Sequence, residues 1–87
     1  MSLNTVELKK KIIYRSNYRG TKEMEVLLSS FVINIINHID KEELENLLNL
    51  LNIDDDNLYK FKKGIETNIK ITDNRISKLF KNYVYKK

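Results

Sequence analysis

Hydrophobic residues recur at intervals of three and four along most of this chain, which is the spacing of one face of an α-helix. The pattern is clearest in residues 19–37, where the segment RGTKEMEVLLSSF combines a polar, glycine-bearing start with an apolar stripe. The stripe is predicted to be buried and consists of Met24, Leu27, Leu28, Phe31 and Ile35. Arg19 and Glu23 are four residues apart, so we expect both to lie along one flank of the stripe, within reach of a partner.

A first helix is predicted before this stripe, over about residues 5–15. Asn4 and Glu7 have the spacing of a capping box, and Leu8 and Ile12 share one face. A turn over residues 16–18 should then lead into the second helix.

The second helix is predicted to start near Gly20 or Thr21 and to run to about Asn37. His38 would lie in its last turn, where the helix dipole favours a cation. Because this helix carries the apolar stripe, we expect the other helices to pack around it.

A third helix is predicted over residues 41–51. Asp40 and Glu43 form an acidic analogue of the capping box at its start. Its apolar face repeats at three and four and consists of Leu44, Leu47, Leu48 and Leu51.

Asp54 is predicted to cap a short fourth helix in which Leu58 and Phe61 face inward. Gly64 suits the left-handed position just after a helix end. Residues 65–71 alternate between apolar and polar side chains, but a single strand would have no pairing partner, so we expect an extended connector.

The last helix is predicted over about residues 73–85, with Thr72 or Asp73 as its cap. Its buried face would consist of Ile76, Leu79, Phe80 and Tyr83. The hydrophobic pattern as a whole therefore predicts an all-α fold, a single domain over residues 1–87 built as a compact bundle of five short helices.

The amino-acid composition excludes several classes of function. The 87 residues contain no Cys, no Pro and two Gly, which excludes thiol chemistry and a disulfide scaffold. A domain of this size buries roughly two-thirds of its unfolded surface, so a surface function is favoured over a deep active site. No apolar run approaches the roughly 20 residues of a membrane span, and no secretory signal is present, so we expect a cytoplasmic protein that is a monomer when free.

The net charge of +4 is unevenly distributed, with basic residues near both ends and acidic residues in the middle. Such a dipolar surface favours oriented docking on a charged partner. The C-terminal run KNYVYKK interleaves Tyr83 and Tyr85 with lysines, as nucleic-acid-binding surfaces do, so a small basic nucleic-acid-binding protein is the alternative function.

The acidic run Asp54, Asp55 and Asp56 does not fit a calcium loop. An EF-hand starting at Asp54 would need Gly at its sixth position and Glu at its twelfth, where this chain has Tyr59 and Ile65. Capping and first-turn acids on a helix dipole explain the run, and its exposed carboxylates could also dock on a basic patch of a partner.

His38 is the only histidine, so neither a metal site nor a catalytic triad can be assembled around it. No nucleophile and base, metal cluster or phosphate-binding loop is recognisable elsewhere. The chain is therefore predicted not to be an enzyme and to bind no metal.

Residues 12–64 resemble the succinate dehydrogenase flavinylation factor family, also called SdhE or succinate dehydrogenase assembly factor 2. The most specific feature is an RGxxE signature followed by an acid and an aromatic residue: Arg19, Gly20, Glu23, Glu25 and Phe31. The second is an acidic turn that leads into a short helix with Leu58, Tyr59, Phe61 and Gly64. The chain departs from the usual family residues at Thr21, Glu25 and Phe61, where Met, Asp and Trp are common.

The resemblance implies a helical assembly factor that binds the flavoprotein subunit of succinate dehydrogenase, and of fumarate reductase in some members. It would promote covalent attachment of FAD to a histidine of that subunit, with no cofactor held stably by this chain. The implied partner-binding residues are Arg19, Gly20, Glu23 and Glu25. Arg19 would donate to a carboxylate or carbonyl of the partner and Glu23 would accept from it. Gly20 is either a turn residue that tolerates positive φ or a point of close approach for the partner's backbone.

Overall fold

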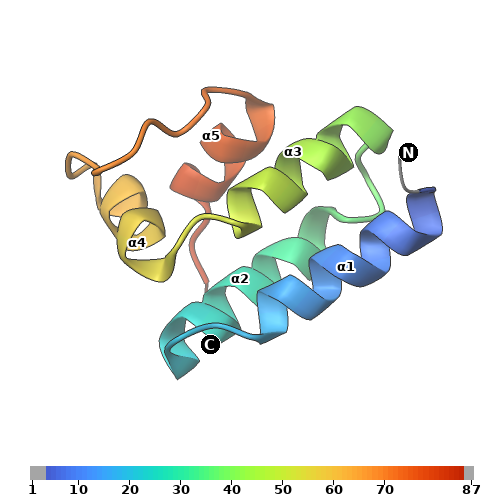
Figure 1. Ribbon diagram of the computed structural model, residues 1–87, viewed down its shortest axis with the longest axis horizontal. Coiled ribbons are helices and arrows are strands. Elements are labelled where there is room, and N and C mark those ends of the chain that lie inside the picture. Colours follow the sequence, from blue (N-terminus) through green and yellow to red (C-terminus); the bar gives the residue numbers. More distant parts are fainter. Residues whose placement is uncertain (1–3, 86–87) are drawn as a thin grey trace.

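The computed structural model describes residues 4–85, and this part of the chain forms an all-α bundle without strands (Figure 1). Its helices are α1 (Thr5–Asn17), α2 (Lys22–Ile35), α3 (Lys41–Leu51), α4 (Asp55–Lys63) and α5 (Arg75–Asn82). The predicted fold class is confirmed. The segment between α4 and α5 has no regular secondary structure, as expected for a connector. None of the helices in residues 4–85 has both the length and the apolar character required to cross a bilayer.

Every helix begins after a polar residue whose side-chain oxygen accepts a hydrogen bond from a backbone N–H in the first turn. These capping residues are Asn4, Thr21, Asp40, Asp54 and Asn74. Each cap satisfies a backbone donor that has no partner inside its helix, which contributes about 1 kcal/mol to stability. The caps therefore determine where the apolar stripes become helical.

Several predicted boundaries are wrong by a few residues. α1 continues two residues further than predicted, and α2 ends at Ile35, which leaves the exposed His38 in the turn that follows. Neither Thr72 nor Asp73 caps α5. Asn74 does so, because Ser77 supplies the reciprocal partner of a capping box, accepting from the Asn74 backbone N–H at 3.0 Å.

α1 and α2 run antiparallel beside each other, and α3 packs alongside α1 (Figure 1). α5 packs against both α3 and α4. The core between them includes the fully buried Ile12, Leu28, Phe31, Leu44, Leu47, Leu58, Ile76 and Phe80. Phe31 and Phe80 meet edge to face, with ring centroids 5.4 Å apart, which joins α2 to α5.

The buried face of α2 differs from the predicted stripe. Met24, Leu28 and Phe31 are buried as expected, whereas Leu27 and Ile35 are only half-buried. Val32 and Ile36 complete the buried face instead. Leu27 is only half-buried because it lines a surface groove.

Leu79 on α5 is also exposed, at 37%, although it was predicted to be buried. The face of this short helix that meets α3 and α4 is centred on Ile76, Ser77 and Phe80. Tyr83 lies just beyond the helix and is half-buried.

Candidate functional site

Arg19 lies in the turn before α2 and is bound within the protein. Its side chain is only 7% exposed. The guanidinium lies 2.8 Å from a carboxylate oxygen of Asp55 and donates to the carbonyls of Leu51 and Ile53 at 2.7 and 2.8 Å. The prediction that Arg19 lies at an accessible edge is therefore wrong. The C-terminal end of α3 leaves carbonyls without helical partners, and Arg19 satisfies them.

Gly20 completes this arrangement, because its backbone N–H donates to the second carboxylate oxygen of Asp55 at 2.7 Å. A Cβ at position 20 would lie 3.1 Å from that oxygen, closer than an ordinary contact. Gly20 does not adopt positive φ; in residues 4–85 only Gly64 does, with φ of 74°, as predicted for its helix end. We call the contact among Arg19, Gly20 and Asp55 the Arg–Asp clamp.

The clamp corrects the prediction that Asp55 is an exposed docking residue. Its carboxylate is half-buried and bound on both oxygens. Asp56 lies 3.1 Å from Lys60 in the next turn, and Asp54 is the cap of α4. Hydrogen bonds from Asn57 lower the pKa of Asp54 below its ordinary value.

Two predicted site residues remain at the surface beside the clamp. Glu23, in the first turn of α2, is exposed and makes no hydrogen bond or ion pair within residues 4–85. Glu25 is half-buried and lies 3.6 Å from Lys22. The positive end of the helix dipole favours both carboxylates. The clamp holds the backbone of Gly20 at the surface next to them.

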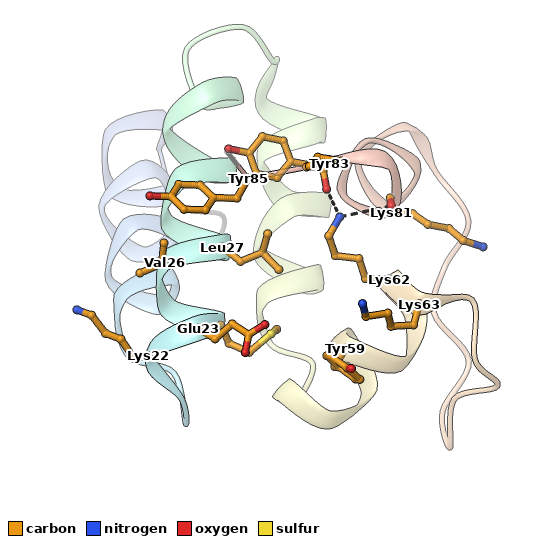
Figure 2. Close-up of a pocket in the computed structure, with 12 residues that line it drawn as sticks. Lys22, Glu23, Val26, Leu27, Tyr59, Lys62, Lys63, Lys81, Tyr83 and Tyr85 are labelled. Carbon is orange, nitrogen blue, oxygen red and sulfur yellow. Dashed lines mark hydrogen bonds between the residues drawn. The ribbon is translucent and has the colours of Figure 1, made fainter. Parts of the chain in front are cut away.

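A groove of about 800 Å³ opens between α2, α4 and the chain that follows α5 (Figure 2). Glu23 and Leu27 line it from α2, Tyr59 and Lys63 from α4, and Tyr85 from the C-terminal segment. The sequence did not indicate this groove. The only sequence signal from this region is the run KNYVYKK, whose alternating tyrosines and lysines favour the alternative function of a nucleic-acid-binding protein.

Lys62 fixes the C-terminal wall of the groove. Its ammonium donates to the carbonyl of Phe80 at 2.8 Å. It also donates to the carbonyl of Tyr83, as Figure 2 shows. Burial lowers the pKa of Lys62, and the charge of Lys63 adds to this effect. Tyr83 is held on its other side, since its hydroxyl donates to the hydroxyl of Ser30 at 3.0 Å.

Within residues 4–85, no group of three His, Cys, Asp or Glu side chains is placed to hold a metal ion. The surface carries a helix start with the unpaired carboxylate of Glu23 among residues 4–85, the carboxylate of Glu25 paired with Lys22, and an adjoining open groove. The fold and this surface define a small all-α protein with a groove beside the start of α2.

Comparison with known protein families identifies the family of this protein. The family described as flavinator of succinate dehydrogenase matches residues 10–84. Because the match covers nearly the whole chain, the protein belongs to this family, and the resemblance drawn from the sequence is confirmed. The match also extends beyond residues 12–64 to include α5 and the groove wall. Comparison with curated proteins and with solved structures found no match.

Proposed function

We propose that this protein binds the flavoprotein subunit of succinate dehydrogenase and promotes covalent attachment of FAD to a histidine of that subunit. Family membership gives a role in flavinylation of the enzyme. The observation that carries the proposal further is the Arg–Asp clamp, which presents Glu23 and Glu25 at a fixed helix start.

The binding residues have different roles in this proposal. Glu23 and Glu25 contact donors on the flavoprotein, and the exposed backbone of Gly20 allows its chain to approach closely. Arg19 acts through the clamp, because its donors are occupied by Asp55 and the end of α3. The half-buried Asp55 likewise positions the surface, and both oxygens of Asp54 accept from Asn57 in the cap of α4, which leaves Asp56 as the secondary docking carboxylate.

The mechanism is a population shift without catalysis by this chain. The protein binds more tightly to the conformation of the flavoprotein in which flavin and histidine are placed to react, so that conformation becomes more populated. The flavin and the partner's histidine carry the chemistry, and this chain holds no cofactor. The setting is the cytoplasm, with the same surface available to a fumarate reductase flavoprotein.

Co-expression with the flavoprotein subunit tests the proposal. Covalent flavin is measured by in-gel fluorescence of the denatured flavoprotein, normalised to the amount of each protein. Glu23→Lys should reduce flavinylation by about fivefold or more, because it reverses a charge at the centre of the contact. Its melting temperature should fall only slightly, because the side chain of Glu23 makes no hydrogen bond or ion pair within residues 4–85 and only its favourable interaction with the helix dipole is lost.

Glu45→Lys is the matched control, because Glu45 is exposed on α3 and does not belong to the surface at the start of α2. It should leave flavinylation unchanged. Flavinylation that is equally efficient without the protein would overturn the proposed function. Equal effects of the two variants would show that Glu23 is not part of the contact.

A further inference from the structure

The groove beside Glu23 exposes several large apolar side chains. Tyr59 is 48% exposed, Val84 69% and Tyr85 41%. These side chains come from α4 and from the C-terminal segment, and Leu27 of α2 lies between them (Figure 2). Contiguous apolar surface in a concave site is typical of a surface that is covered by a partner.

Among the residues that the structure describes, one free cationic group faces this apolar floor. The ammonium groups of Lys62 and Lys63 both point into the groove, but that of Lys62 is bound to backbone carbonyls, which leaves Lys63 (Figure 2). Lys63 forms no ion pair within residues 4–85, and its ammonium lies 5.6 Å from the ring centroid of Tyr59, so its stem follows the aromatic surface while its charge remains accessible. Lys22 and Lys81 line the rim with their ammonium groups directed away from the groove (Figure 2).

The groove wall is built into the fold. Lys62 binds carbonyls of the C-terminal segment, and Tyr83 is tied to α2 through Ser30 and through Asn34, whose amide donates to the Tyr83 hydroxyl at 3.0 Å. The phenol ring of Tyr83 also packs 5.3 Å from Phe31. The groove is therefore a preorganised shape, which reduces the entropy lost on binding.

We propose that this groove binds a segment of the flavoprotein that places a large apolar side chain beside one or more carboxylates. The apolar side chain would fill the floor between Leu27 and Tyr59, and a carboxylate would pair with Lys63. The inference rests on the proposed function and adds the chemistry of the partner's segment. A long polyanion fits less well, because the carboxylate of Glu23, which is unpaired within residues 4–85, lines the groove and would repel it.

Charge reversal tests Lys63. The variant Lys63→Glu should weaken binding of the purified flavoprotein about tenfold and reduce the salt dependence of binding, as measured by calorimetry. The control Lys70→Glu changes the net charge equally on an exposed residue that does not line the groove. It should bind like the wild type. Circular dichroism melts establish that both variants are folded.

Cross-linking identifies what occupies the groove. Because the chain has no Cys, Tyr59→Cys creates a single attachment site for a benzophenone maleimide, and Lys10→Cys serves as the control site. After irradiation of the complex, the flavoprotein peptide attached at position 59 should contain Asp or Glu near a large apolar residue. A basic peptide, a second copy of this chain, or a nucleic acid at position 59 would each overturn the inference.

The two proposals fail in different ways. If the lysine variant binds the flavoprotein and supports flavinylation like the wild type, the groove is not a docking site, although the proposed function stands. If the wild-type protein itself neither binds the flavoprotein nor changes its flavinylation, the proposed function fails, and the inference fails with it.

Discussion

The guanidinium of Arg19 lies where four acceptors meet: the carbonyls of Arg15, Leu51 and Ile53 and the carboxylate of Asp55. A planar group with several fixed donors suits this geometry, whereas a single ammonium would reach only part of it. The same carboxylate accepts the backbone N–H of Gly20, so one aspartate is bound from two neighbouring residues. Arg19 and Gly20 belong to the RGxxE signature, but their contacts are with Asp55 and the end of α3, so these two residues shape the surface.

Arg19→Lys keeps the charge and should nevertheless lower the free energy of unfolding by about 2–3 kcal/mol, because charge-assisted hydrogen bonds to a half-buried carboxylate are lost. Urea titration followed by circular dichroism measures the change. Arg15→Lys is the control, since Arg15 is exposed on α1, and its stability should stay within about 0.5 kcal/mol of the wild type. A similar loss in both variants would contradict the role assigned to the clamp.

The start of α4 shows how one cap is connected to its surroundings. Asp54 accepts from the backbone N–H of Asn57 at 3.2 Å and from its side-chain amide at 2.7 Å. The buried Asn57 in turn accepts from the backbone N–H of Asn68 at 2.9 Å. The cap therefore orders both the first turn of α4 and the connector that returns to α5.

Asp54 should make the stability of this helix sensitive to acid. Its pKa in the folded protein lies below the ordinary value of 3.8, so the unfolded chain takes up a proton more readily. The stabilisation is complete above that value and is lost as the pH falls through and below it. Asp54→Asn keeps a capping oxygen but cannot titrate, so its melting temperature should fall less on acidification than that of the wild type.

Thermal melts across the acidic range measure this difference, with Asp73→Asn as the control. Asp73 is exposed and caps no helix. It should leave the acid sensitivity unchanged. An Asp54→Asn variant that is as sensitive to acid as the wild type would show that the cap does not contribute to the pH dependence.

Across the whole molecule, the features that the sequence predicted are local and those that it missed are not. The helices follow from apolar spacing, and caps such as Asp40 and Asp54 act on a residue only three positions away. By contrast, the clamp joins residues 36 positions apart, and Lys62 meets Phe80 18 positions away. No local rule connects such pairs, because their contact depends on how the helices pack. For the same reason, the sequence identified Glu23 as accessible but misplaced Arg19, and it did not indicate the groove.

Removing the ammonium of Lys62 tests the long-range contact that closes the groove. Lys62→Met keeps the apolar stem and should lower the free energy of unfolding by about 1–2 kcal/mol, because carbonyls at the end of α5 lose their donor. Hydrogen exchange should become faster in residues 83–85. Lys63→Met is the neighbouring control, since the Lys63 ammonium makes no hydrogen bond in residues 4–85, and it should leave this exchange unchanged. If hydrogen exchange in residues 83–85 is unaltered in the Lys62 variant, the ammonium of Lys62 does not hold this segment in place.

The Arg–Asp clamp changes how variants of this protein behave inside a cell. A domain of this size is stable by only about 5–10 kcal/mol, so weakening the clamp would enlarge the unfolded fraction that proteases degrade. A cell carrying an Arg19 or Gly20 variant would then lack flavinylated enzyme because it holds too little of the protein, even if the contact surface on each remaining folded molecule were unchanged. Cellular abundance thus separates the two halves of the RGxxE signature: it should fall for Arg19 and Gly20 and be retained for Glu23.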